Sequence, residues 1–417
     1  MAVALSVASC KDKDEIPENM PGGSGTMHEF TSSESKQFLE ETAKEAMGLL
    51  NPADQEDFLE LSSYFIEEYG DYELPENFYG EDDDDYYYAK KFFADMAKAV
   101  KNGDGAGMTR AMAEYVYSFD YDNLKGIYEP NYRREEWTYV GSSNDIIFRF
   151  DNAKSQQCEL KVSGNSKYNS GSFEVVDDWY DYSEIYNYRF PTEVNFTLTE
   201  NGTQLASGKV NSDFSIDGHT LNLDVTATVA NISANAKVNG TDTKVSESTT
   251  TTVGGKTFLT TWASVTGHHL CDINYFDRLS SSDEASILAQ LFETGEATAT
   301  LIDKVSVDAT VNYTYDMYDA FEMYAYSQRE AEKYTNVLNS GTTAIVRYNN
   351  TKTKQASLTW DYTANRYGEY QIEPVLVFPD GSSIFFVDYF SNGFTGVESA
   401  WNNLVRKYEA VLNRYFN

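Results

Sequence analysis

The chain has 417 residues, of which 41% are hydrophobic and 24% charged, so its composition is that of a folded globular protein rather than a disordered one. Its 66 acidic residues outnumber 32 basic residues and give a formal net charge of -34, which argues against nucleic-acid binding and against electrostatic docking on anionic lipid headgroups. Cations and neutral ligands remain as partners, and the 32 Tyr residues suit both half-exposed sheet faces and ligand platforms.

The first ten residues form an apolar run that closes on small residues and a cysteine. Val7-Ala8-Ser9-Cys10 resembles the lipobox of bacterial lipoproteins, and the charged run from Lys11 to Glu15 is similar to the surface-export signal of Bacteroidota lipoproteins. The resemblance implies that Cys10 is lipidated and becomes the first residue of the mature protein. It also implies an outer membrane lipoprotein, exposed at the cell surface, whose membrane partner is reached through this anchor. The body resembles other cell-envelope lipoproteins.

A polar segment connects this anchor to the rest of the chain. Residues 17–26, with the run Pro21-Gly22-Gly23-Ser24-Gly25, have no apolar period and predict a flexible tether. We therefore assign residues 1–30 to a signal remnant, the lipidated Cys10 and the tether. A lipid anchor on such a tether implies a folded body that is held off a membrane.

Residues 31–122 show the apolar period of helices. Thr31 and Glu34 have the spacing of a capping box, and Asn51 followed by Pro52 is typical of a second helix start. Two further helices are predicted, from about residue 85 to 102 and from about 106 to 119, and the four form a small bundle or a cap on a sheet. The acidic run 81–85 suits a helix N-terminus better than a calcium loop, because consecutive Asp residues cannot all face one ion.

From residue 123 the period changes to that of strands, and we predict a β domain over residues 123–417. Apolar residues alternate from Leu221 to Val229 and then change phase, which predicts a bulge or a turn at Ala230-Asn231. Pro374 predicts an edge position or a bulge for its strand. Four dipeptides that tolerate positive φ predict tight hairpins: Asn201-Gly202, Asp217-Gly218, Asn239-Gly240 and Gly254-Gly255.

Three helices are predicted inside the β domain, over residues 282–293, 318–339 and 396–416. The last carries an apolar stripe, and we expect its Trp401, Leu404 and Tyr408 to be buried against the sheet. A strand is expected over residues 383–390. The predicted fold class is α+β, with an N-terminal helical region followed by a large, curved antiparallel β-sheet domain that packs helices on one face.

The stretch 173–190 is the most aromatic part of the chain and also holds several acidic residues. Tyr and Trp rings stack on sugars while carboxylates accept hydrogen bonds from sugar hydroxyls, so this mixture predicts a ligand-binding surface. Its candidate residues are Trp179, Tyr180, Tyr182, Tyr186 and Tyr188. The alternative interpretation is that these side chains only pack a curved sheet.

Motifs that carry chemistry are missing from the sequence. It has no nucleophile elbow, zinc-binding helix, phosphate loop, dinucleotide fingerprint or redox cysteine pair, so we assign no catalytic residue and no cofactor. His268-His269 before Cys271 does not predict a metal site, because adjacent side chains of a strand point to opposite faces. The sequence does not decide whether Cys158 and Cys271 form a disulfide, since their separation along the chain says nothing about their distance in space.

Three functions are compatible with this sequence. The first is a non-enzymatic, lipid-anchored envelope protein that binds a glycan or another neutral ligand through the aromatic stretch. The second is a carrier of a lipid or another apolar small molecule, held between a curved sheet and a helix. The third is a glycoside hydrolase, but with 66 acidic residues no carboxylate pair stands out.

Overall fold

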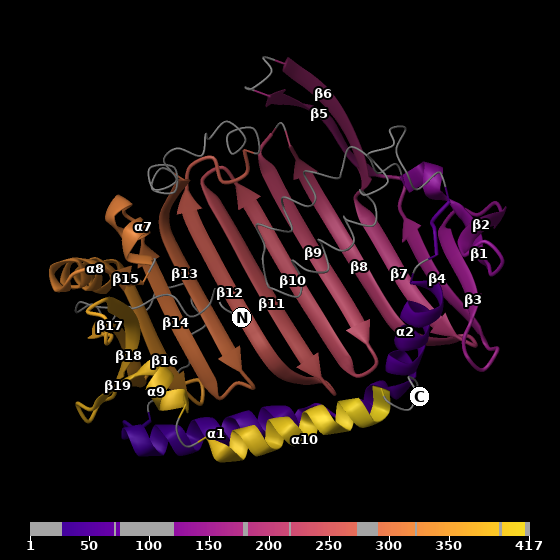
Figure 1. Cartoon of the computed structure of the whole chain (residues 1–417). Helices are drawn as coiled ribbons and strands as arrows, with labels where there is room; N and C mark the ends of the chain where they lie inside the picture. The colour runs from indigo at the N-terminus through magenta and orange to yellow at the C-terminus, as the bar shows by residue number, and fades with distance from the viewer. Residues whose placement is uncertain are drawn as a thin grey trace. The chain divides into compact units, whose positions relative to one another are not determined.

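Figure 1 shows the computed structural model of the chain, which describes residues 27–70, 72–75, 121–177, 182–216, 218–272, 291–321, 323–391 and 394–412. It confirms the α+β class, because an N-terminal helix precedes a large β-sheet. The chain divides into two compact units. Unit 1 comprises Met1–Leu50, Thr243–Leu270 and Ser280–Leu404, and unit 2 comprises Asn51–Asp242, Cys271–Leu279 and Val405–Asn417. Each unit thus combines segments that are distant in the sequence.

Helix α1, Ser32–Leu49, begins as the sequence predicts. The backbone N–H of Glu34 donates to Thr31 Oγ1 at 3.3 Å, and the backbone N–H of Thr31 donates to Glu34 Oε2 at 2.8 Å. This capping box supplies two of the acceptors that the first turn of a helix lacks.

The second helix starts differently from the prediction. Asn51 makes no capping bond to the backbone, and Pro52 opens a short 3-10 helix, η2, Pro52–Gln55, which leads into α2, Glu56–Tyr69. The Asn51 amide instead donates to Asp54 Oδ1, because the tighter 3-10 turn brings that carboxylate within reach. The third and fourth predicted helices and the acidic run 81–85 lie outside the described residues.

Unit 2 contains a short 3-10 helix, a series of eight strands and a separate two-stranded ribbon. The elements of the series are η6 Tyr121–Leu124, β1 Gly126–Asn131, β2 Glu136–Gly141, β3 Ile146–Asp151, β4 Gln157–Gly164, β7 Glu193–Glu200, β8 Thr203–Ser215, β9 Thr220–Val229 and β10 Ile232–Thr241. The strands pair in the order β2-β1-β3-β4-β7-β8-β9-β10.

One pair corrects the prediction of an antiparallel sheet. β3 pairs with β1 in the parallel direction, whereas the other pairs of this series are antiparallel. The reason lies in the connection: β1 and β2 form a hairpin, and the chain then passes to the far side of β1 before it forms β3. The sheet is therefore mixed.

Tight turns set the register of the hairpins. Val229 pairs directly with Ile232, and Ala230 adopts a φ of +50°, so the predicted turn at Ala230-Asn231 is confirmed. Asn201-Gly202 and Gly254-Gly255 also have positive φ at both residues, as type I′ turns require. The prediction of a tight turn at Asn239-Gly240 is wrong. Both residues lie inside β10, opposite Asn222 and Leu221, because pairing with β9 outweighs their preference for turns.

Unit 1 contains a second strand series. Its strands are β11 Lys244–Val253, β12 Lys256–Gly267, β13 Phe292–Leu301, β14 Val305–Asn312, β15 Tyr324–Ala325, β16 Thr342–Tyr348, β17 Lys354–Ala364, β18 Tyr370–Val377 and β19 Ser383–Phe385. They pair antiparallel in the order β11-β12-β13-β14-β16-β17-β18, and both β15 and β19 pair with the outer side of β18.

Pro374 has the edge position that the sequence predicts. On one side it lies opposite Trp360 of β17. On the other side, β15 pairs with residues 370 and 371 and β19 with residues 375–377, so among the described residues no strand pairs with residue 374 there. The missing N–H of proline therefore breaks no ladder bond.

The predicted helix 318–339 is interrupted. It consists of α7, Tyr315–Phe321, and α8, Gln328–Gly341, with β15 between them. Ser327 starts the new helix because its side chain accepts a hydrogen bond from the backbone N–H of Glu330. The predicted strand 383–390 also ends early, and α9, Phe386–Ser391, follows β19. Most of the predicted helix 282–293 lies outside the described residues, and its last residues open β13.

Helix α8 and the strands β16 to β18 share one hydrophobic core. Ala331 and Leu338 of α8 are fully buried together with Ala344, Trp360 and Ile372 of the strands. The indole N–H of Trp360 donates to Thr342 Oγ1 at 3.1 Å, and the Asn339 side chain bonds both backbone groups of Trp360. These bonds satisfy polar groups that the core would otherwise leave without partners.

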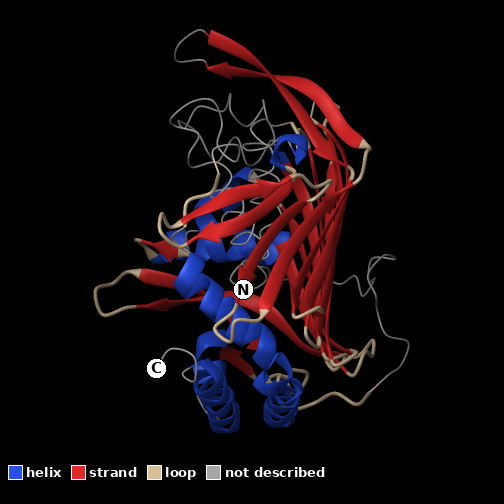
Figure 2. Cartoon of the chain, turned by 90° about the vertical axis from the view of Figure 1, so that its right-hand side faces the viewer, coloured by secondary structure: helices blue, strands red, loops and turns tan. Residues whose placement is uncertain are grey.

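The C-terminal helix α10, Thr395–Leu412, corrects another expectation. Leu404 is buried, but Trp401 is 56% exposed. Within unit 1 the first part of α10 lies beside α1, where Gly396 contacts Glu40 and Lys44, and Figures 1 and 2 show the two helices side by side. A neighbouring helix covers a narrower stripe of α10 than a sheet would, so Trp401 lies outside the covered stripe.

Within the described ranges, no helix has the length and apolar character needed to cross a membrane.

Trp360, which is buried, and Trp401, which is exposed, allow a direct test of these two positions. Trp360→Ala should lower the free energy of unfolding by about 3 to 5 kcal/mol, because it removes a buried side chain and leaves a cavity. Trp401→Ala is the matched control and should change it by less than ~0.5 kcal/mol. Urea denaturation followed by circular dichroism measures both. Equal losses in the two variants would contradict the exposed position of Trp401.

Candidate functional site

The predicted aromatic stretch forms a two-stranded ribbon in unit 2. β5, Tyr168–Asp177, and β6, Tyr182–Pro191, pair antiparallel from Tyr168 opposite Pro191 to Asp177 opposite Tyr182, as a sheet of their own. Figure 1 shows the ribbon rising clear of β7, β8 and β9. An isolated two-stranded ribbon is at best marginally stable in water, so this one needs support at its base.

The structure brings only part of the predicted site onto described elements. Tyr182, Tyr186 and Tyr188 lie on β6, opposite Asp177, Phe173 and Gly171 of β5. Trp179 and Tyr180 belong to the connection between the two strands and lie outside the described residues, as does Cys10.

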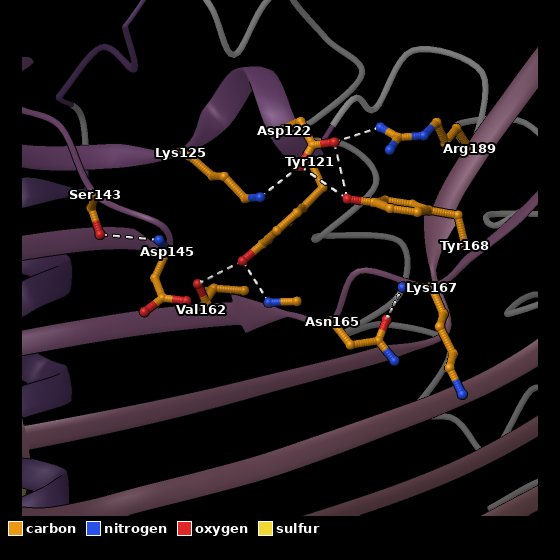
Figure 3. Close-up of polar contacts among 11 residues, drawn as sticks. Tyr121, Asp122, Lys125, Ser143, Asp145, Val162, Asn165, Lys167, Tyr168 and Arg189 are labelled. Atoms are coloured by element: carbon orange, nitrogen blue, oxygen red, sulfur yellow. Dashed lines mark hydrogen bonds and ion pairs between the residues drawn. The ribbon is translucent and has the colours of Figure 1, made fainter.

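The first support is a charged cluster at the base of the ribbon, which Figure 3 shows. Asp122, in η6, accepts hydrogen bonds from three side chains: Lys125 Nζ at 2.6 Å, Arg189 Nη1 at 2.5 Å and the Tyr168 hydroxyl at 2.9 Å. The Arg189 guanidinium also stacks on the Tyr168 ring, 3.5 Å from its centroid. Because Tyr168 belongs to β5 and Arg189 to β6, one carboxylate holds both strands.

These partners determine the protonation state of the cluster. The hydrogen bonds from Lys125 and Arg189 lower the pKa of Asp122 to about 2, and the same carboxylate raises the pKa of Lys125. Burial, followed by the bond to Asp122, raises the pKa of Tyr168. An acid with a pKa near 2 is poorly matched to proton transfer at neutral pH, whereas its three hydrogen bonds suit Asp122 to positioning the ribbon.

Tyr121 fixes η6, and therefore Asp122, to the end of β4. Its ring is almost completely buried, its hydroxyl donates to Val162 O, and the backbone N–H of Gly164 donates to that hydroxyl. Residue 164 must be glycine here, because a Cβ would lie 2.7 Å from the Tyr121 ring and 3.1 Å from Pro191 at the end of β6. Gly164 thus lets both the Tyr121 ring and Pro191 approach the end of β4, which brings η6 and the ribbon to the same place.

The second support attaches the ribbon to β8. The Asn169 side chain, which is buried, donates to Ser212 Oγ at 2.9 Å and accepts from the backbone N–H of Phe214 at 3.3 Å. Ser212 Oγ donates in turn to Pro191 O, and the rings of Phe190 and Phe214 lie 6.3 Å apart. Asn169 and Phe190 are opposite each other in the ribbon, so they share one face, and Tyr168 and Arg189 belong to the other. The base is therefore held on both faces.

Sequence reasoning singled out residues 173–190 as a candidate surface but predicted neither the ribbon nor its supports. The Asp122–Lys125 pair has a helical i,i+3 spacing and was readable as a local contact. The bond between Asp122 and Arg189 joins residues 67 positions apart, and no local pattern indicates it.

A second polar cluster of unit 2 was also missed. His219 Nδ1 lies 2.7 Å from Asp242 Oδ2, and its Nε2 lies 3.8 Å from Asp272 Oδ1. In unit 1, His268 Nε2 lies 3.1 Å from Glu293. Among the residues that the structure describes, no group of three or more His, Cys, Asp or Glu side chains is arranged to hold a metal ion.

The two cysteines of the body are free and buried. Burial raises the pKa of Cys158 to about 12 and that of Cys271 to about 11. Both thiols therefore stay protonated at neutral pH, and the disulfide that the sequence left open is not formed.

No known protein family, curated protein or solved structure matches this chain.

Asp122 allows a test of the first support. Asp122→Asn removes the charge that Lys125 and Arg189 share, so at neutral pH we expect faster proteolysis within residues 168–191 and a loss of stability of roughly 1 kcal/mol, allowing for solvent screening. Because the folded-state pKa is depressed from 3.8 to about 2, the stabilisation is complete above pH 3.8. It is lost as pH falls through 2, and the two proteins should converge there.

Asp213→Asn, on β8, removes an exposed carboxylate and is the matched control for this charge change. It should leave ribbon proteolysis unchanged at every pH. If Asp122→Asn is cleaved no faster than the parent at neutral pH, Asp122 does not hold the ribbon.

Proposed function

We propose that this protein is a non-enzymatic, lipid-anchored protein of the cell envelope, exposed at the outer membrane surface, that binds a glycan or another neutral ligand through the β5–β6 ribbon. The observation that carries the proposal is the support of the ribbon on both faces. Ion-pair and amide contacts hold its base, while the strands that carry the aromatic stretch continue beyond them.

A ribbon whose base is held in place can carry a binding surface in a fixed position. Ligand binding requires contact residues that are positioned in advance, because ordering them on binding costs affinity. Tyr182, Tyr186 and Tyr188 have the same parity along β6, and residues of one parity belong to one face of a strand. Aromatic rings on one face of a ribbon form the kind of platform on which sugar rings stack.

The charge of the chain favours a neutral ligand. A net charge of -34 repels anions, whereas carboxylates among the aromatic residues, such as Asp177 and Glu184, are acceptors for sugar hydroxyls.

The finer architecture is part of this proposal. We infer that the sheet is curved and that helices pack on one of its faces. The core that α8 shares with β16 to β18 supports this arrangement within unit 1.

The anchor predicts a change in localisation. Cys10→Ser should release the protein from the membrane fraction without a change in melting temperature, because it removes the attachment point of the lipid and leaves the body unaltered. Cell fractionation and mass spectrometry of the N-terminal peptide measure the effect. Unchanged fractionation together with a parent peptide that carries no lipid would reject the anchor.

The ribbon predicts a change in ligand binding. Trp179→Ala should abolish glycan binding in an array of neutral oligosaccharides and shift the free energy of unfolding by less than ~0.5 kcal/mol, as for an exposed side chain. Tyr326→Ala, which removes a strongly exposed ring of unit 1, is the control and should bind as the parent does. A sharp drop in the melting temperature of Trp179→Ala would show that the residue packs a core, and the platform would be rejected.

A further inference from the structure

The segment that enters the body from the anchor is attached firmly to unit 1. The backbone N–H of Met27 donates to Thr353 Oγ1 at 2.8 Å, and the Thr353 hydroxyl donates back to Met27 O at 3.0 Å. Gln355, which is fully buried, accepts from the backbone N–H of Phe30 and donates to His28 O. These four bonds determine where on the body the chain from Cys10 arrives.

An apolar surface lies next to this entry point. It consists of Ile384, Val387 and Phe390, which are 36%, 56% and 42% exposed, and we name it the α9 patch. Val387 and Phe390 are one turn apart on α9, and Ile384 lies on β19 just before that helix.

Direct contacts join the α9 patch to the start of α1. The hydroxyl of Tyr389, between the two α9 residues of the patch, donates to Ser32 O at 3.1 Å. Lys36 Nζ lies 5.4 Å from the centroid of Tyr389 and 5.1 Å from that of Phe394, and Phe394 stacks on Phe390 at 5.3 Å. The patch therefore adjoins the first turn of α1, five residues after Met27.

We propose that the α9 patch rests on the lipid surface into which the anchor at Cys10 inserts. This inference rests on the lipid anchor of the proposed function. Residues 11–26 separate Cys10 from Met27, and a chain of this length spans at most about 55 Å. The tether therefore keeps the entry point, and the patch beside it, within that distance of the membrane.

The chemistry of the patch fits the interface of a neutral bilayer. Aromatic and aliphatic side chains enter the boundary between headgroups and acyl chains, whereas the lysine beside them keeps its charge in the headgroup region. The net charge of -34 opposes anionic lipid, so the surface should be zwitterionic.

The test uses the full chain with Cys10→Ser, so that no lipid on the protein contributes. Co-sedimentation with phosphatidylcholine vesicles should show weak partitioning that is insensitive to salt. Adding Val387→Asp should lower the partition coefficient about tenfold, equivalent to ~1.4 kcal/mol, because it places a charge in the patch. Phe390→Ala should lower it by a smaller factor. Tyr326→Ala, with a more exposed ring that does not belong to the α9 patch, should leave it unchanged, and equal melting temperatures show that all variants fold.

The possible results separate the two proposals. No partitioning of the Cys10→Ser chain, or equal partitioning of the Val387→Asp variant, overturns the patch even if the native protein is lipidated. Binding only to vesicles rich in phosphatidylglycerol, reversed by salt, overturns it in favour of electrostatic docking. A concentration-dependent dimer that Val387→Asp dissociates overturns it in favour of a second copy. Absence of lipid on native Cys10 rejects the anchor, whereas the vesicle result stands separately.

Discussion

A two-stranded ribbon is at best marginally stable in water, and the contacts that unit 2 makes with the base of β5 and β6 answer that constraint. Asp122 stabilises one face of the ribbon base by accepting hydrogen bonds from Lys125, Arg189 and Tyr168. Asn169 stabilises the other face through its hydrogen bonds with Ser212 and Phe214. Tyr121 and Gly164 serve the same end, because they fix the position of Asp122.

The acidic surface limits what the protein can contact. Acidic residues outnumber basic residues two to one in the chain as a whole. Asp122 nevertheless forms ion pairs with two cationic side chains, Lys125 and Arg189. A field of that sign repels phosphate and carboxylate ligands and admits neutral ones. Both proposed contacts, a neutral glycan and a zwitterionic lipid surface, obey this restriction, and both use aromatic or aliphatic side chains rather than charge.

The two proposed contacts belong to different units. The ribbon is part of unit 2, whereas the entry segment and the α9 patch are part of unit 1. In each unit a buried amide supports the exposed element: Asn169 under the ribbon, and Gln355 under the segment Met27 to Phe30. A buried amide whose groups are all bonded is costly to displace, so each element is held in one position.

The sequence by itself determined the local features of this protein. Alternation identified β9 and β10, positive-φ dipeptides located the turns at 201–202 and 254–255, and Thr31 with Glu34 marked the start of α1, because each depends on residues a few positions apart. The tertiary structure alone decided which partners meet. It placed Arg189 on Asp122, paired β3 with β1, left Trp401 exposed beside α1 and kept Asn239-Gly240 inside a strand. These outcomes depend on contacts between distant segments, whose energies outweigh local preference and leave no trace in a local pattern.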